Sequence, residues 1–178
     1  MLIRHIVISG PSASGKSTLI KMLLKAFPNL SLSISHTTRP MRQGEVDGKD
    51  YYFVSRSTFE DLIKNRRMLE YAEFNEHYYG TSLSELEDTP KVFDVEFRGV
   101  SYFKENYPSF LYIFIDCDRE TVRKRLIARG DRDLKARLEL YDEFQKIKNL
   151  EIFQKIINNN NSKEESFEQL SSFIKENL

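Results

Sequence analysis

The chain has 178 residues, a length that suits one compact domain with room for inserted subdomains. Its 27 Lys and Arg residues balance 27 Asp and Glu residues, so the net charge gives no reason to expect nucleic acid or an anionic membrane as a partner. The single cysteine, Cys117, cannot form an intrachain disulfide, and no signal peptide or long apolar run is evident. We therefore expect a cytoplasmic protein in which Cys117 is a buried core residue.

The most informative stretch is Gly10-Pro11-Ser12-Ala13-Ser14-Gly15-Lys16-Ser17, followed by Thr18, which matches the phosphate-loop pattern G-x-x-x-x-G-K-[ST]. Apolar residues 2–8 predict a buried strand before it, and residues 16–27 predict a helix after it. Glycines allow backbone N–H groups to turn inward around nucleotide phosphates. Lys16 can then reach the β- and γ-phosphates, and the Ser17 hydroxyl can bind Mg²⁺.

The residue composition of the chain then changes twice before its next core strand. Residues 30–35 alternate as a half-buried strand does, and residues 36–50 are polar and cationic. Residues 51–54 return to strand-like composition, Ser57-Thr58-Phe59-Glu60 has the form of a capping box, and residues 68–74 read as a strand. This part is typical of an insertion between core elements.

The second half of the chain alternates strands with helices. A core strand at residues 91–97 would hold Asp94 and Glu96 on one face and end at Gly99, before a short helix at 100–107. Residues 110–115 form an apolar run typical of a buried parallel strand, and Asp118 can cap the helix that ends near Gly130. A helix at 134–147, a strand at 153–157 and a capping box at Ser162-Lys163-Glu164-Glu165 complete a parallel α/β pattern.

Two stretches carry a more specific resemblance. Residues 35–42 read Ser-His-Thr-Thr-Arg-Pro-Met-Arg, and residues 44–55 read Gly-Glu-Val-Asp-Gly-Lys-Asp-Tyr-Tyr-Phe-Val-Ser. With the phosphate loop, they make the chain resemble a guanylate kinase, a P-loop kinase that uses ATP to phosphorylate GMP. The resemblance implies an α/β fold with a parallel P-loop NTPase-type sheet flanked by helices. It divides the single domain, residues 1–178, into a core (1–32 and 92–178), a GMP-binding subdomain (about 33–91) and a short helical lid (about 125–140).

The same resemblance assigns the acceptor site. The GMP phosphate would be bound by Arg39, Arg42, Tyr51 and Tyr79, and guanine would be read by Ser35, Glu70, Thr81 and Glu96. The chemistry agrees, because the planar guanidinium group matches phosphate oxygens, and a carboxylate matches the adjacent N1–H and N2–H₂ donors of guanine.

On the donor side, the resemblance makes residues 10–18 and Arg125 the ATP-binding set and Arg129 and Arg137 catalytic lid arginines. Lys16, Arg39 and Asp94 complete the catalytic set, and Ser17 and Asp94 are the metal candidates. Asp94 would either hold Mg²⁺ through water or contact the acceptor. For Arg125 an ordinary ion pair on a helix surface is an equal alternative.

The sequence departs from the family pattern at four places. The segment between Ser82 and Lys91 and the one between Gly130 and Arg137 are short, Glu96 stands where aspartate is usual, and Arg98 replaces glutamine. Two alternatives to a kinase of GMP and dGMP therefore stay open: a related kinase with another small phosphate-bearing acceptor, and a catalytically inert module that binds proteins. The expected assembly is a monomer or a homodimer.

Overall fold

A computed structural model describes residues 4–74, 76–86, 89–131 and 133–177. Its core is a five-stranded sheet in which every neighbouring pair of strands is parallel. The strand order is β2 (Ser31–Leu32), β7 (Lys91–Asp94), β1 (Ile6–Ser9), β8 (Leu111–Asp116) and β9 (Lys155–Asn158). This confirms the predicted parallel α/β fold.

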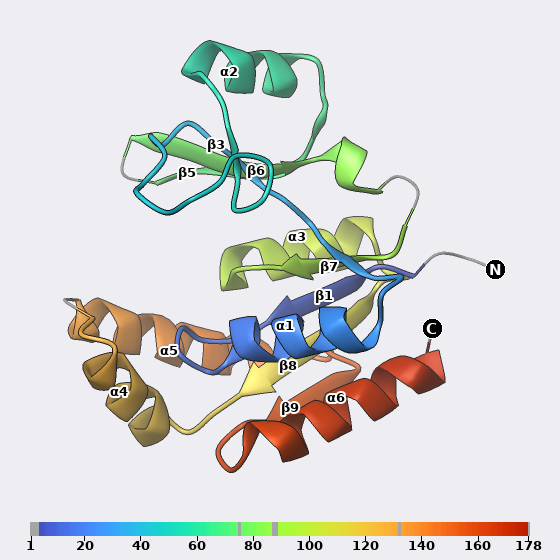
Figure 1. Ribbon diagram of the computed structural model, residues 1–178, viewed down its shortest axis with the longest axis vertical. Coiled ribbons are helices and arrows are strands. Elements are labelled where there is room, and N and C mark those ends of the chain that lie inside the picture. The colour runs from blue at the N-terminus through green and yellow to red at the C-terminus, as the bar shows by residue number, and fades with distance from the viewer. Residues whose placement is uncertain (1–3, 75, 87–88, 132, 178) are drawn as a thin grey trace.

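Helices cover both faces of this sheet (Figure 1). Helices α1 (Lys16–Ala26) and α6 (Lys163–Asn177) pack on the face that carries Ile6 and Ile8, and α3 (Phe97–Asn106) and α5 (Leu134–Lys148) pack on the face that carries Val7. Helix α4 (Arg119–Ala128) packs against α5, around the buried Cys117. None of the described helices is long and apolar enough to cross a membrane.

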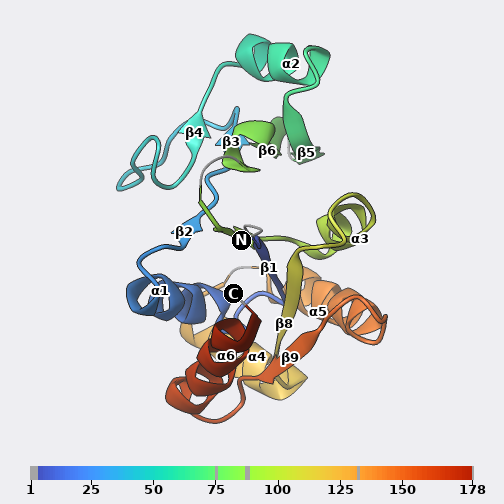
Figure 2. The same cartoon turned by 90° about the vertical axis from the view of Figure 1, so that its right-hand side faces the viewer.

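A smaller sheet rises above the core (Figure 2). Its strand order is β4 (Tyr52–Phe53), β3 (His36–Thr37), β6 (His77–Ser82) and β5 (Met68–Phe74), with helix α2 (Arg56–Lys64) packed on it and the short 3₁₀ helix η1 (Leu83–Leu86) following β6. We call residues 36–86 the small unit.

The buried Glu85 lies where the chain passes between the core and the small unit. Its carboxylate accepts the backbone N–H of Ile34 at 3.0 Å and forms an ion pair with Lys91 at 3.6 Å. Ile34 lies between β2 and β3, and Lys91 begins β7. One carboxylate therefore ties together the outgoing and the returning connection.

Four predicted boundaries were wrong. Strand β7 ends at Asp94, and Gly99 lies inside α3, because Glu96 is the N-cap residue of that helix. Helix α2 is capped by Ser55, whose Oγ accepts the Thr58 N–H at 3.0 Å, so the capping box does not begin at Ser57. The strand predicted at 30–35 is limited to β2, and the one at 153–157 begins only at Lys155. The cap at Ser162 is confirmed, because its Oγ accepts the Glu165 N–H at 3.1 Å.

Candidate active site

The phosphate-loop sequence forms the turn between β1 and α1, as its pattern predicts. Gly10, Ala13 and Gly15 have φ angles of 148°, 60° and 99°, in the region that favours glycine. A side chain at Gly10 would place its Cβ 2.3 Å from the carbonyl oxygen of Ile115 in β8. The first glycine of the motif is therefore required by the close approach of the loop to the neighbouring strand.

The amino end of α1 is open to an anionic ligand. Gly15 is the N-cap residue and supplies no side-chain cap, and the first turn contains no acidic residue. The backbone N–H groups there combine with the helix dipole to favour phosphate. Ser17 and Thr18 follow in the first turn with exposed side chains.

Lys16 lies across the loop. Its Nζ donates to the carbonyl oxygen of Gly10 at 2.6 Å and to that of Pro11 at 3.3 Å. Desolvation lowers the pKa of the Lys16 ammonium, and the charges of Asp94 and Glu96 act in the opposite direction. The ammonium is thus held beside the loop by carbonyl oxygens that phosphate oxygens can replace.

Asp94 stands at the carboxyl end of β7, in register with Ile8 of β1. Desolvation raises the pKa of the Asp94 carboxyl group. The positive charge of Lys16 lowers this pKa, and the negative charge of Glu96 raises it. The two carboxylates and the ammonium therefore form one electrostatic group next to the phosphate loop. Glu96 belongs to this core group, whereas the other three residues predicted to read guanine lie together in or beside the small unit, as described next. The side chain of Arg98 is outside the described part of the chain.

The acceptor-phosphate candidates meet on the small unit. Arg39 lies with its guanidinium carbon 5.6 Å from the ring centroid of Tyr51, and the rings of Tyr51 and Tyr79 meet edge-on at 6.2 Å. Arg39 donates from Nη1 and Nη2 to Glu45 at 3.0 and 2.7 Å. Arg42 joins the cluster through its backbone N–H, which donates to Glu45 at 2.7 Å, while its side chain is exposed.

The guanine candidates form a second cluster on the adjoining strands. The Glu70 carboxylate accepts the backbone N–H of Thr81 at 3.0 Å, and the hydroxyl groups of Thr81 and Ser35 are 3.2 Å apart. Burial raises the pKa of the Glu70 carboxyl group, and hydrogen bonds from Thr81 act in the opposite direction. Gly80 permits the close pairing of β5 and β6, because a Cβ there would lie 2.5 Å from the carbonyl oxygen of Glu70.

The lid arginines meet beside the phosphate loop. Arg129 donates to Asp131 at 2.6 Å and to Ser12 Oγ at 3.4 Å, and Arg137 forms an ion pair with Asp131 at 3.9 Å. The Arg129 guanidinium holds the pKa of Asp131 below its ordinary value. Asp131 thus binds both predicted lid arginines.

Arg125 is placed differently. Its guanidinium lies against the carbonyl oxygens of Ala13 and Ser14, at 3.4 and 3.3 Å, and against that of Asn159 at 2.9 Å. These contacts fit neither a surface ion pair nor a side chain free to move with a lid. Arg125 contacts the phosphate loop itself.

Sequence reasoning missed three residues of this region. Glu45 lies within the quoted motif, Asp131 in the short segment between Gly130 and Arg137, and Asn159 just beyond the strand predicted at 153–157, and none of them has an assigned role. Asn159 directly follows β9, and ligands of parallel α/β sheets bind at the carboxyl ends of strands, so its position was a usable signal.

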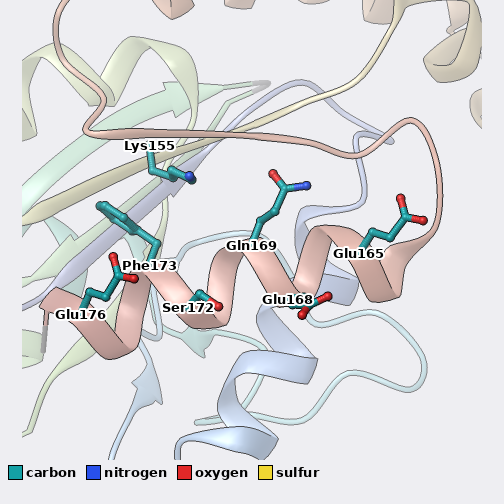
Figure 3. Close-up of a pocket in the computed structure, with 7 residues that line it drawn as sticks. All are labelled: Lys155, Glu165, Glu168, Gln169, Ser172, Phe173 and Glu176. Atoms are coloured by element: carbon teal, nitrogen blue, oxygen red, sulfur yellow. The ribbon is translucent and has the colours of Figure 1, made fainter.

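A separate groove of about 460 Å³ lies between β9 and α6 (Figure 3). Lys155 of β9 lines it, and its other lining residues extend along α6 from Glu165 to Glu176. Three of them are carboxylates, at Glu165, Glu168 and Glu176, and they disfavour a phosphorylated ligand.

The parallel sheet with a phosphate loop between β1 and α1 defines a P-loop nucleotide-binding protein. Residues 3–177 match the family model described as guanylate kinase. A guanylate kinase of Helicobacter hepaticus is 41% identical over 157 residues, which cover 82% of this chain and 78% of the relative. A guanylate kinase of Helicobacter pylori is 38% identical over 162 residues, 86% of this chain and 78% of that one.

The three-dimensional comparison agrees. A crystal structure of guanylate kinase from Anaplasma phagocytophilum matches with a TM-score of 0.74 and 29% sequence identity, covering 99% of this chain and 87% of that one. The chain belongs to the guanylate kinase family, whose activity is the phosphorylation of GMP to GDP with ATP.

Proposed function

We propose that this protein transfers the γ-phosphoryl group of ATP directly to GMP and dGMP, with the phosphate loop and the small unit as its two substrate sites. Residues 10–18 bind the ATP phosphates, and Lys16, Arg129 and Arg137 supply positive charge to the transferred group. Such charge matters because a loose transition state spreads negative charge over the equatorial phosphoryl oxygens.

On the acceptor side, Arg39, Arg42, Tyr51 and Tyr79 bind the GMP phosphate, and Ser35, Glu70 and Thr81 bind guanine. One observation carries this proposal. Tyr79 and Thr81 are two residues apart in β6 and therefore share a face of that strand, so the two clusters lie side by side. A base-reading group next to a phosphate-reading group is what a nucleoside monophosphate requires.

Mg²⁺ is part of the proposal. Ser17 offers an exposed hydroxyl oxygen in the first turn of α1, and Asp94 offers a carboxylate at the end of the adjacent β7. These hard oxygen donors fit Mg²⁺, which is held by one or two protein oxygens, water and substrate phosphates. When bound, the ion would neutralise charge on the β- and γ-phosphate oxygens. Glu96 is a candidate contact for either this group or the acceptor base.

A coupled assay of ADP release with GMP, dGMP, AMP, CMP and UMP tests the proposal. We expect turnover with GMP and dGMP and kcat/KM for AMP lower by at least about a hundredfold. Turnover with another acceptor alone would favour the related kinase. That alternative rests on Glu96, which stands where the family usually has aspartate. Binding of GMP without turnover would favour an inert module.

We also propose that the protein is cytoplasmic and is a monomer or a homodimer. Cys117 is a free and buried thiol, which suits a reducing cytoplasmic compartment. Light scattering at assay concentration separates a monomer from a homodimer.

A further inference from the structure

Two side chains from distant elements contact the backbone of the phosphate loop. Arg125 reaches the carbonyl oxygens of Ala13 and Ser14 from α4. Asn159, which follows β9, donates from Nδ2 to the same Ser14 oxygen at 2.6 Å. Residues more than a hundred positions apart in the sequence therefore converge on one peptide group of the loop.

Asn159 is itself fixed in place. It is 4% exposed, its backbone N–H donates to the carbonyl oxygen of Asp116 at 2.8 Å, and its carbonyl oxygen accepts from Arg125 at 2.9 Å. Gly15 makes room for its amide group, because a Cβ at Gly15 would lie 2.1 Å from Nδ2. The second glycine of the motif and Asn159 are thus complementary in shape.

The orientation of the Ser14 carbonyl group determines the direction of the next backbone donor, the Gly15 N–H. In a trans peptide the C=O and the following N–H point in opposite directions. Because Asn159 and Arg125 bind the Ser14 carbonyl oxygen, the Gly15 N–H points away from these two side chains. Ala13, a residue with a side chain and a φ angle of 60°, adds backbone strain to the loop, and external contacts help to hold such a loop in one conformation.

We propose that Asn159, assisted by Arg125, is a positioning residue that keeps the phosphate loop in the conformation that receives the ATP phosphates. It acts through the Ser14 peptide group and touches no phosphate. The inference rests on the proposed role of residues 10–18 as the phosphate site. It makes Arg125 a support for the loop in addition to its predicted place on the ATP side.

The test uses inorganic tripolyphosphate, which has the charged part of ATP and no base. Its affinity for the full chain is measured by calorimetry for the unmodified protein, Asn159→Ala and the matched control Asn161→Ala, an exposed asparagine of the same loop. We expect Asn159→Ala to weaken tripolyphosphate binding and to raise the ATP KM about tenfold. The GMP KM should stay within about twofold, and the control should behave as the unmodified protein does.

Each other outcome decides a separate question. Unchanged tripolyphosphate affinity in Asn159→Ala overturns the proposal, and a loss of ATP affinity alone would then make Asn159 a contact of the base. If the alanine variant does not fold, Asn159→Leu keeps about the same side-chain volume and removes the amide donor without adding charge, and the same loss is expected. Failure of the unmodified protein to bind tripolyphosphate would instead contradict the phosphate-loop assignment itself.

Discussion

Arg39 and Glu45 form a two-pronged ion pair, with Nη1 to Oε2 at 3.0 Å and Nη2 to Oε1 at 2.7 Å. Glu45 also accepts the backbone N–H of Arg42 at 2.7 Å. The carboxylate therefore fixes the guanidinium group over the Tyr51 ring and shapes the turn that carries the second arginine. One acidic residue thus orders the loop that carries both arginines proposed to bind the GMP phosphate.

We expect Glu45→Gln to raise the GMP KM about five- to tenfold and to leave the ATP KM unchanged, because the amide offers one acceptor oxygen and no charge. Steady-state kinetics with each substrate varied in turn measures the effect. Glu60→Gln is the matched control, since Glu60 also pairs with an arginine of the small unit but on an exposed helix face. A lower GMP KM would show that Glu45 competes with the phosphate for Arg39.

Arg39→Lys should not behave as a conservative change. Lysine keeps the charge but lacks the planar fork, so it cannot bond Glu45 at two points and still face phosphate oxygens. The GMP KM should rise and kcat should fall, both in steady-state assays. Arg56→Lys is the control, because Arg56 makes ion pairs at an exposed position of the same unit. Unchanged constants for Arg39→Lys would place this residue outside the site.

Lys16→Ala should lower kcat by on the order of 10²- to 10³-fold while the GMP affinity stays within about twofold. The reason is that the Lys16 ammonium acts on the donor phosphates, whereas the GMP candidates lie on the small unit. Single-turnover kinetics and GMP calorimetry measure the two quantities, and Lys21→Ala, at an exposed position of α1, is the control. Turnover close to normal would contradict the assignment of Lys16.

The sequence allowed the elements and the phosphate loop to be predicted because local patterns determine them, whereas the resemblance to guanylate kinases supplied most of the other candidate residues. A phosphate loop needs its glycines at fixed spacing, and a buried parallel strand reads as an apolar run. The end of β7 was misjudged because Glu96 and Gly99 are compatible with a strand or with the start of a helix, and in the structure Glu96 is the N-cap residue of α3.

Local sequence patterns could not predict contacts between distant segments. Asn159 lies in a run of four asparagines, and its bond to Ser14 joins residues 145 positions apart. Nothing local distinguishes it from its neighbours. Local patterns also could not predict that Glu96 and Glu70 lie apart. Glu96 follows the core strand β7, whereas Glu70 lies in β5 of the small unit.

The Glu70 carboxyl group gives GMP binding a characteristic dependence on pH. Burial raises its pKa above the ordinary value of 4.5, and only the ionised form accepts both guanine donors. GMP affinity should therefore be complete well above this raised pKa and should decline as the pH falls through it, at a higher pH than for an exposed glutamate.

Calorimetry of GMP binding as a function of pH, compared between the unmodified protein and Glu70→Gln, checks this, because the titrations of Asp94, whose pKa is also raised, and of the GMP phosphate are common to both proteins. In Glu70→Gln the part of the decline that Glu70 causes should disappear, and the preference for GMP over AMP should shrink. Two charge-assisted hydrogen bonds, at about 1.5–3 kcal/mol each, underlie the expected hundredfold preference. AMP presents no N1–H donor, so the partly buried Glu70 carboxylate loses a hydrogen bond, and AMP should bind weakly at every pH above the Glu70 pKa. Equal affinities for AMP and GMP in the unmodified protein, or an unaltered decline in Glu70→Gln, would remove Glu70 from the base site.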